Sequence, residues 1–161
     1  MGCCGRNGYI IAVFYGRFDH AIDDKGRVSI PARFREVLQR EGHDRLYITN
    51  FMLDGERLLE LFPPNEWDKV VAKFSSSRAT DREAQLFETF YLGGAHEVLV
   101  DRQGRILVPP RLRDFARLGR EVIFSAKHNR FELWDKNTLE RILSSTEESF
   151  QNPEFLAKIN I

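Results

Sequence analysis

The residues best suited to chemistry lie in a stretch that the sequence contains twice. IDDKGRVSIPARFR covers Ile22 to Arg35, and VDRQGRILVPPRLR covers Val100 to Arg113. Six of the fourteen positions are identical: one aspartate, one glycine, one proline and three arginines. A guanidinium group is planar and donates two parallel hydrogen bonds, so arginine suits phosphate groups and guanine edges. The repeated stretch therefore favours contact with a phosphate-rich partner.

Positive charge is concentrated on this stretch, although the chain as a whole is neutral. Twenty-four lysines and arginines balance 24 aspartates and glutamates. The segment from Arg17 to Arg40 nevertheless carries about +2, and the segment from Asp101 to Arg120 about +4. This asymmetry is typical of a neutral protein with one basic face.

A structural interpretation of the same residues stays open beside the nucleic-acid one. Asp23 can pair with Arg27, and Asp101 with Arg105, as salt bridges across their own turns. Arg33 and Arg35 are two positions apart, so on a helix their side chains point in different directions. One of them can therefore be a solvated charge without a ligand.

The rest of the chain offers no pattern for catalysis or cofactor binding. No nucleophile elbow, phosphate-binding loop or dinucleotide fingerprint occurs, and the histidines, His20, His43, His96 and His128, lack metal-ligand spacing. Cys3 and Cys4 are adjacent and cannot form a disulfide that cross-links distant parts of the core. No apolar run approaches the length of a membrane span. We therefore expect a cytoplasmic protein that is not an enzyme, with no metal, cofactor, small-molecule substrate or membrane partner.

Local signals predict the elements that position the arginines. Gly26 and Gly104 can adopt positive φ in turns where an aspartate bonds the backbone two residues further on. Each turn lies between short strands and is followed by a short helix with proline in its first turn. We expect the helices to cover 31–40 and 110–118, with Gly42 and Gly119 ending them.

A hairpin and then a helix follow in each copy, with Asp54-Gly55 and His128-Asn129 at the hairpin turns. The offset between the copies falls from 78 to 72 residues, so we expect the first hairpin to be about six residues longer. The predicted order of elements in each unit is therefore β-turn-β-α-β-β. A unit of about 45 residues buries little apolar surface alone, so we expect the two units to interleave into one barrel core.

A connector helix and a C-terminal helix complete the expected structure. TDRE matches a capping box with Thr80 as N-cap and Glu83 three residues on. The apolar stripe that follows, Leu86, Phe87, Phe90 and Tyr91, favours a core or subunit contact, and Gly93-Gly94 end the helix. From residue 137 we expect a helix to about Phe150 and then a looser end. Residues 1–13 are interpreted as a loose extension or as sequence upstream of the true start.

Three segments together resemble the MraZ family over roughly Tyr15 to Leu143: YGRFDHAIDDKGRVSIPARFREVL, FYLGGAHEVLVDRQGRILVPPRLRDFA and NRFELWD. The Asp-x-x-x-Arg motif is the family's mark, and its presence in both copies makes the resemblance specific. The stretch before Phe14 departs from the family's usual short start. The resemblance implies an α+β fold in which tandem β-α-β-β repeats form an AbrB-like swapped-hairpin β-barrel with flanking helices.

The resemblance also implies a division of the chain. We expect an N-terminal extension at 1–14, SpoVT-AbrB domains at 15–63 and 94–137, connector helices at 64–93, and a C-terminal helix and tail at 138–161.

The implied function is sequence-specific DNA-binding transcriptional regulation. Members act on short direct repeats in the promoter of the division and cell-wall gene cluster, associate with the nucleoid in the cytoplasm and form ring-shaped homo-oligomers. An alternative is a ring-forming structural or interaction module with incidental DNA affinity. By analogy Arg27 leads the DNA contact. The candidates for DNA binding are Arg27, Lys25, Arg33, Arg35, Arg105, Arg102 and Arg111, with Asp23, Gly26, Asp101 and Gly104 shaping the turns.

Overall fold

A computed structural model describes residues 13–76 and 81–160. Within these ranges the chain is α+β, with one six-stranded sheet and one two-stranded sheet. The elements in chain order are β1 (Arg17–Ala21), β2 (Arg27–Ser29), α1 (Ala32–Arg40), β3 (Arg45–Leu53), β4 (Glu56–Phe62), α2 (Pro64–Ser76), α3 (Arg82–Tyr91), β5 (His96–Leu99), β6 (Arg105–Leu107), α4 (Pro110–Phe115), β7 (Glu121–Lys127), β8 (Arg130–Asp135), α5 (Lys136–Ser149) and α6 (Pro153–Ile159).

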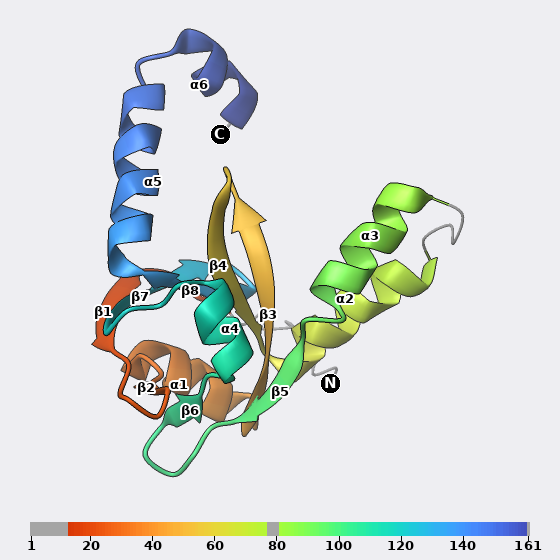
Figure 1. Ribbon diagram of the computed structural model, residues 1–161, viewed down its shortest axis with the longest axis vertical. Helices are drawn as coiled ribbons and strands as arrows, with labels where there is room; N and C mark the ends of the chain where they lie inside the picture. The colour runs from red at the N-terminus through yellow and green to blue at the C-terminus, as the bar shows by residue number, and fades with distance from the viewer. Residues whose placement is uncertain (1–12, 77–80, 161) are drawn as a thin grey trace, which may run out of the picture.

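The two repeats exchange their first strands. β1 of the first repeat pairs antiparallel with β7 of the second, and β5 of the second pairs antiparallel with β3 of the first. The resulting strand order, β1-β7-β8-β4-β3-β5, joins the two hairpins through β4 and β8, where Leu59 lies opposite Leu133. β2 and β6 form a separate two-stranded ribbon (Figure 1). Neither repeat therefore completes the sheet alone.

One hydrophobic core draws on both repeats, as the sequence predicts. Val28 and Phe34 of the first repeat belong to the same buried cluster as Ile106 and Phe131 of the second. The rings of Phe34 and Phe131 lie 4.7 Å apart. Phe14, which the sequence placed in the N-terminal extension, is also buried in this core, and its backbone N–H donates to the carbonyl of His128 at 2.7 Å.

The helix ends differ between the repeats. Gly42 follows α1 with φ of 74°, as predicted. α4 ends earlier than expected, at Phe115, and Arg117 adopts the left-handed conformation with φ of 52°. Gly119 therefore does not end the helix; its N–H donates to Asp135 Oδ1 at 3.0 Å. Because α1 has nine residues and α4 has six, part of the length difference assigned to the first hairpin lies in the helices.

The connector and the tail correct two further expectations. α3 begins after Asp81, whose carboxylate accepts from the Glu83 N–H at 3.1 Å, so Asp81 is the N-cap. Thr80, the expected cap, lies outside the described residues. The tail is not a looser end beyond Phe150, because Asn152 caps the further helix α6 through the Glu154 N–H at 2.9 Å.

The helices outside the core extend away from it. Figure 1 shows α5 on one side of the long β3–β4 hairpin and the α2–α3 pair on the other. The α3 stripe is only partly packed: Tyr91 is buried, whereas Phe87 and Phe90 are 41% and 37% exposed. No helix in the described ranges is long and apolar enough to cross a membrane.

Candidate nucleic-acid interface

Two matching turns hold the motif residues, the first turn (Asp23–Arg27) and the second turn (Asp101–Arg105). In the first turn, Asp23 Oδ1 accepts from the N–H of Lys25 at 3.0 Å and of Arg27 at 2.8 Å. The second turn repeats both bonds at 2.9 Å each. Gly26 and Gly104 have φ of 86° and 76°, a conformation that side chains disfavour. The predicted turn chemistry is confirmed in both copies.

Each turn also contains an ion pair between its aspartate and its arginine. Arg27 Nε donates to Asp23 Oδ2 at 3.0 Å, and Arg105 Nε donates to Asp101 Oδ2 at 3.0 Å. The salt bridges that the sequence left open are therefore present. They use only Nε, and within residues 13–76 and 81–160 no hydrogen bond or ion pair involves the Nη atoms of Arg27 or Arg105. Each guanidinium is thus oriented while its terminal donors stay available.

The turn hydrogen bonds lower the pKa of both aspartates. For Asp23 the backbone N–H of Arg27 contributes most, and the Arg27 side chain adds to it. The backbone N–H of Arg105 does the same for Asp101. Both carboxylates remain ionised near neutral pH, so the charge that orients each arginine is present under ordinary conditions.

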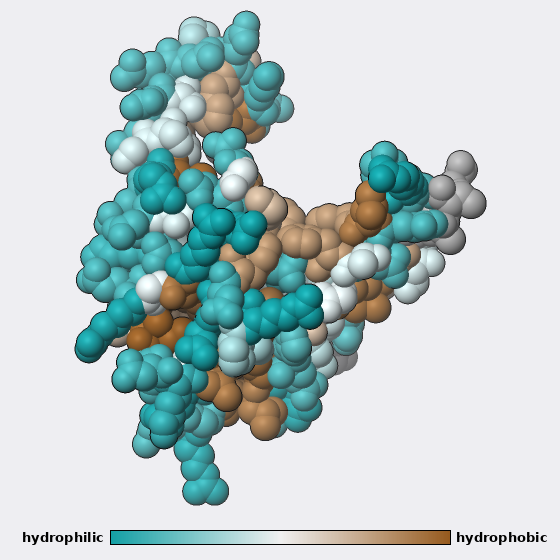
Figure 2. Space-filling model, viewed as in Figure 1, coloured by the Kyte–Doolittle hydropathy of each residue, from teal (hydrophilic) through white to brown (hydrophobic). Residues whose placement is uncertain are grey.

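The β2–β6 ribbon brings the two arginines onto one surface. Val28 lies opposite Ile106, and both are buried. Because side chains alternate along a strand, the flanking residues point to the other, outer side. There Arg27 lies opposite Leu107 and Arg105 opposite Ser29. Hydrophilic side chains gather over this end of the molecule in Figure 2.

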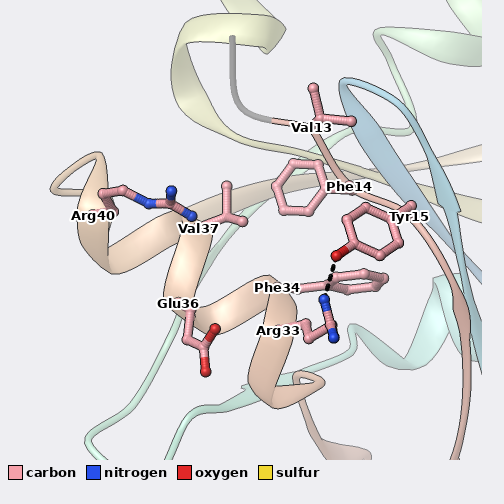
Figure 3. A pocket seen from close by; sticks show the side chains of 8 residues that line it. All are labelled: Val13, Phe14, Tyr15, Arg33, Phe34, Glu36, Val37 and Arg40. Carbon is pink, nitrogen blue, oxygen red and sulfur yellow. Dashed lines mark hydrogen bonds between the residues drawn. The ribbon is translucent and has the colours of Figure 1, made fainter. Parts of the chain in front are cut away.

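The other predicted candidates are distributed around this ribbon. Lys25 and Arg102 are exposed within the two turns, with no side-chain partner among the described residues. Arg33 donates to the Tyr15 hydroxyl and lies over that ring, 5.2 Å from its centroid (Figure 3). Arg111 lines a separate cavity of about 190 Å³ with Phe90 and other residues near the end of α3. The seven basic candidates therefore do not form a single cluster.

Arg35 and its counterpart Arg113 occupy equivalent places across the repeats. Arg35, from α1, lies against Gly104 in the second turn, and Arg113, from α4, lies against Gly26 in the first turn. Arg113 was not among the candidates. Its identity with Arg35 in the repeated stretch is the sequence signal that points to it.

The described residues contain no group of three or more histidine, cysteine, aspartate or glutamate side chains that could hold a metal ion. The ribbon and its two turns instead offer the guanidinium groups of Arg27, Arg105 and Arg102 and the ammonium group of Lys25. Such groups bind phosphate oxygens or the acceptor edges of bases.

The fold and the ribbon define a class: an α+β chain of two strand-exchanged repeats with a basic β-ribbon. A family model described as "MraZ protein, putative antitoxin-like" matches residues 13–90 and 91–157. The chain belongs to the MraZ family.

Relatives in this family match three quarters or more of the chain. A protein of Desulforamulus reducens is 39% identical over 139 residues, which are 86% of this chain and 93% of the relative. One of Syntrophobacter fumaroxidans is 39% identical over 145 residues, or 89% and 94% of the two chains. One of Thermomicrobium roseum is 43% identical over 122 residues, or 76% and 81%. All three are named "Transcriptional regulator MraZ".

Proposed function

We propose that this chain is a sequence-specific DNA-binding transcriptional regulator that acts on short direct repeats in the promoter of the division and cell-wall gene cluster. The names of its relatives support the regulatory role. The proposal places the protein in the cytoplasm, associated with the nucleoid. It needs neither a cofactor nor catalysis.

The observation that carries the proposal is the outer face of the β2–β6 ribbon. A two-stranded ribbon is one of the elements that the major groove of DNA admits. Arg27 and Arg105 stand on that face with their Nε atoms already bound to Asp23 and Asp101. An arginine fixed at Nε loses less conformational entropy when its Nη atoms bind a phosphate or a guanine.

In this proposal the exchanged strands form an AbrB-like swapped-hairpin barrel. Residues 15–63 and 94–137 are its two SpoVT-AbrB units, 64–93 connect them, and 138–161 form the C-terminal helix and tail. The strand exchange and the shared core support a barrel built from both units together. The two units are unequal at the turns, because Lys25 of the first turn is replaced by Gln103 in the second. Contact with DNA through the first unit is therefore expected to dominate.

The decisive experiment measures binding to a duplex from the region upstream of the chain's own gene at several salt concentrations. Lysine and arginine contacts to phosphates release counterions, so the affinity of the parent chain should fall steeply with salt. Arg27→Ala should weaken binding and reduce the salt slope by about one. Arg40→Ala is the matched control, because Arg40 is an exposed arginine at the end of α1 and off the ribbon. If Arg27→Ala binds as tightly as the parent, the assignment of Arg27 is wrong.

We extend the proposal to a ring of identical subunits. The exposed part of the α3 stripe supports it, since Leu86 is 54% exposed and adjoins Phe87 and Phe90. Contiguous exposed apolar residues mark interaction surfaces. Figure 2 shows hydrophobic residues along α3 on its side toward the β3–β4 hairpin.

Light scattering tests the ring and the alternative function together. Leu86→Glu should reduce the particle mass, whereas Glu88→Gln, a change of an exposed polar residue on the same helix, should not. A ring that shows no affinity for duplex DNA even at low salt would favour the structural or interaction module over the regulator.

A further inference from the structure

We infer that Arg35 and Arg113 are positioning residues, and that each holds the DNA-contacting turn of the opposite repeat. The inference rests on the proposed function. It assigns Arg35 a role different from direct DNA contact, and it gives the same role to Arg113, the equivalent residue of the second repeat.

The first observation is the close approach of each guanidinium to a turn glycine. A Cβ atom built on Gly26 would lie 2.7 Å from Arg113 Cζ and 2.8 Å from its Nε. A Cβ on Gly104 would lie 2.9 Å from Arg35 Nε and 2.5 Å from its Nη1. Real side chains do not come this close. Each arginine therefore occupies the space that only a glycine leaves free.

The second observation is that backbone hydrogen bonds also run from each repeat to the turn of the other. The Ile30 N–H, just beyond β2, donates to the Gly104 carbonyl at 2.8 Å. The Val108 N–H, just beyond β6, donates to the Gly26 carbonyl at 2.8 Å. Each turn is thus held by a strand end and an arginine that both come from the other repeat.

The third observation is that both arginines have a buried donor atom without a partner, which is energetically unfavourable. The Nε atoms of Arg35 and Arg113 are buried without a hydrogen-bond partner in the described part of the chain. Arg35 Nη1 makes one long bond, 3.5 Å, to the Gln103 carbonyl. A buried donor without a partner is unfavourable and calls for an explanation. The close packing of each guanidinium against a turn glycine of the other repeat is what the structure gains in return.

These contacts link each arginine to the DNA-contacting side chain of the opposite repeat. Arg113 packs on the turn that contains Asp23, and Asp23 orients Arg27. In the same way, Arg35 packs on the turn that contains Asp101, and Asp101 orients Arg105. Loss of this close contact should let the turn move and make Arg27 or Arg105 less preorganised, without removing a phosphate contact.

Charge-conserving variants separate positioning from direct contact. Lysine keeps the positive charge and the aliphatic stem but cannot present a flat guanidinium. We therefore choose Arg113→Lys and Arg35→Lys, with Arg40→Lys as the matched control on the exposed end of α1. Because the arrangement is reciprocal, either variant tests the inference if the other one does not fold.

Amide hydrogen exchange gives a readout that needs no DNA. Arg113→Lys should speed exchange several-fold at Lys25, Gly26 and Arg27 in the first turn and leave the second turn unchanged. Arg35→Lys should do the reverse, at Gln103, Gly104 and Arg105. Changes confined to the variant's own repeat, equal changes in both turns, or no change in either would each overturn the inference.

DNA binding completes the test. Arg113→Lys should weaken binding about threefold to tenfold while the salt slope stays that of the parent chain, because the number of phosphate contacts is unchanged. A reduced slope would instead identify a direct contact and overturn the inference. If the parent chain shows no salt-dependent binding to the upstream duplex, the proposed function fails. The exchange experiment still decides whether the crossed contacts hold the turns.

Discussion

In each turn one aspartate has two roles. Its Oδ1 closes the backbone turn, and its Oδ2 holds the arginine at Nε. A salt bridge inside the turn and a contact with nucleic acid are compatible, because the bridge uses Nε and leaves the Nη atoms without a partner among the described residues. The ion pair is thus better understood as a device for orientation than as a source of stability, as expected for exposed pairs.

At the same scale, substitution of a turn glycine by alanine should destabilise the fold more than the same substitution at another glycine with the same backbone angle. Gly104 and Gly42 have φ of 76° and 74°, but a Cβ would meet Arg35 at Gly104 and, among the described residues, no atom within 4 Å at Gly42. Gly42→Ala should therefore lower the free energy of unfolding by about 1–2 kcal/mol, from the left-handed backbone alone. Gly104→Ala should cost a further ~1–3 kcal/mol, because Arg35 must be displaced.

Urea unfolding of both variants measures the difference between the two glycines. The double variant Arg35→Ala/Gly104→Ala is the control, since removal of the arginine should abolish most of the extra loss caused by Gly104→Ala. Equal losses for Gly42→Ala and Gly104→Ala would show that the close approach carries no energetic weight.

The turn aspartates predict a pH dependence with a definite sign. Their pKa values are lowered in the folded chain. Their contribution to stability is therefore complete above the ordinary aspartate pKa of about 3.9 and is lost as the pH falls through the lowered folded-state pKa. NMR titration of the carboxyl carbons of Asp23 and Asp101 should give midpoints below the ordinary value.

Arg27→Ala provides the internal control for this titration. It should raise the pKa of Asp23 only part of the way, because the backbone N–H of residue 27, the largest contribution, remains. The pKa of Asp101 should not move. A midpoint of Asp23 at its ordinary value in the parent chain would contradict the hydrogen-bonded turn.

At the scale of elements, the buried carboxylate of Glu60 helps to fasten α3 to the sheet, beside the hydrogen bonds that Thr49 and Asn50 of β3 donate to carbonyls of α3. Glu60 of β4 is 2% exposed; one carboxylate oxygen accepts from the Tyr91 hydroxyl, and the other from Arg130 Nε at 3.0 Å. Burial, more than the nearby Glu60 carboxylate, raises the pKa of Tyr91, so its hydroxyl stays protonated as a donor. This carboxylate therefore joins β4, β8 and α3.

Removal of the arginine from this group should be costly. Arg130→Met leaves the buried Glu60 carboxyl group with a single hydroxyl donor, which should lower the free energy of unfolding by about 3–5 kcal/mol. In the double variant Arg130→Met/Glu60→Gln the neutral amide still accepts from Tyr91, so most of the loss should be recovered. Chemical denaturation measures both. A double variant as unstable as Arg130→Met would mean that packing of the arginine, rather than its charge, is what matters.

The elements that the sequence predicted correctly are those with strong local signals. Asp54 and Gly55 both have positive φ, as a two-residue hairpin turn requires, and Gly42 ends α1. The errors fall where local signals compete. Arg117 took the left-handed position expected of Gly119, and Asp81 is the cap next to the expected Thr80. Which residue caps or ends a helix depends on how the neighbouring chain packs.

Contacts between the repeats were the least predictable part of the site. That two small units would share a core followed from their size, but the pairing of β1 with β7 and of β5 with β3 is a long-range choice. The approach of Arg35 and Arg113 to the turn glycines depends on that pairing. A glycine expected to provide positive φ alone therefore turned out to provide space as well.

At the scale of the whole molecule, strand exchange makes the two repeats one cooperative unit. β1 has β7 as its neighbour in the sheet, and β5 has β3, so a separated repeat would keep its own hairpin and leave its first strand unpaired. The buried cluster around Phe34 and Phe131 would also be cut in two. Unfolding of the full chain should accordingly be a single transition, seen alike by probes in either repeat.

Cleavage of the chain after Gly93 provides the sharpest test of this unity. Fragments 1–93 and 94–161 should each lack fixed tertiary structure as monomers, because neither can bury its half of the core alone. Mixed in equal amounts, they should form a 1:1 complex with the near-ultraviolet circular dichroism of the intact chain, and its melting temperature should rise with concentration. Light scattering distinguishes this complex from a fragment that pairs with its own copy. If either fragment folds cooperatively as a monomer, the repeats are independent domains, and the exchanged strands are not what holds the ribbon and its arginines in place.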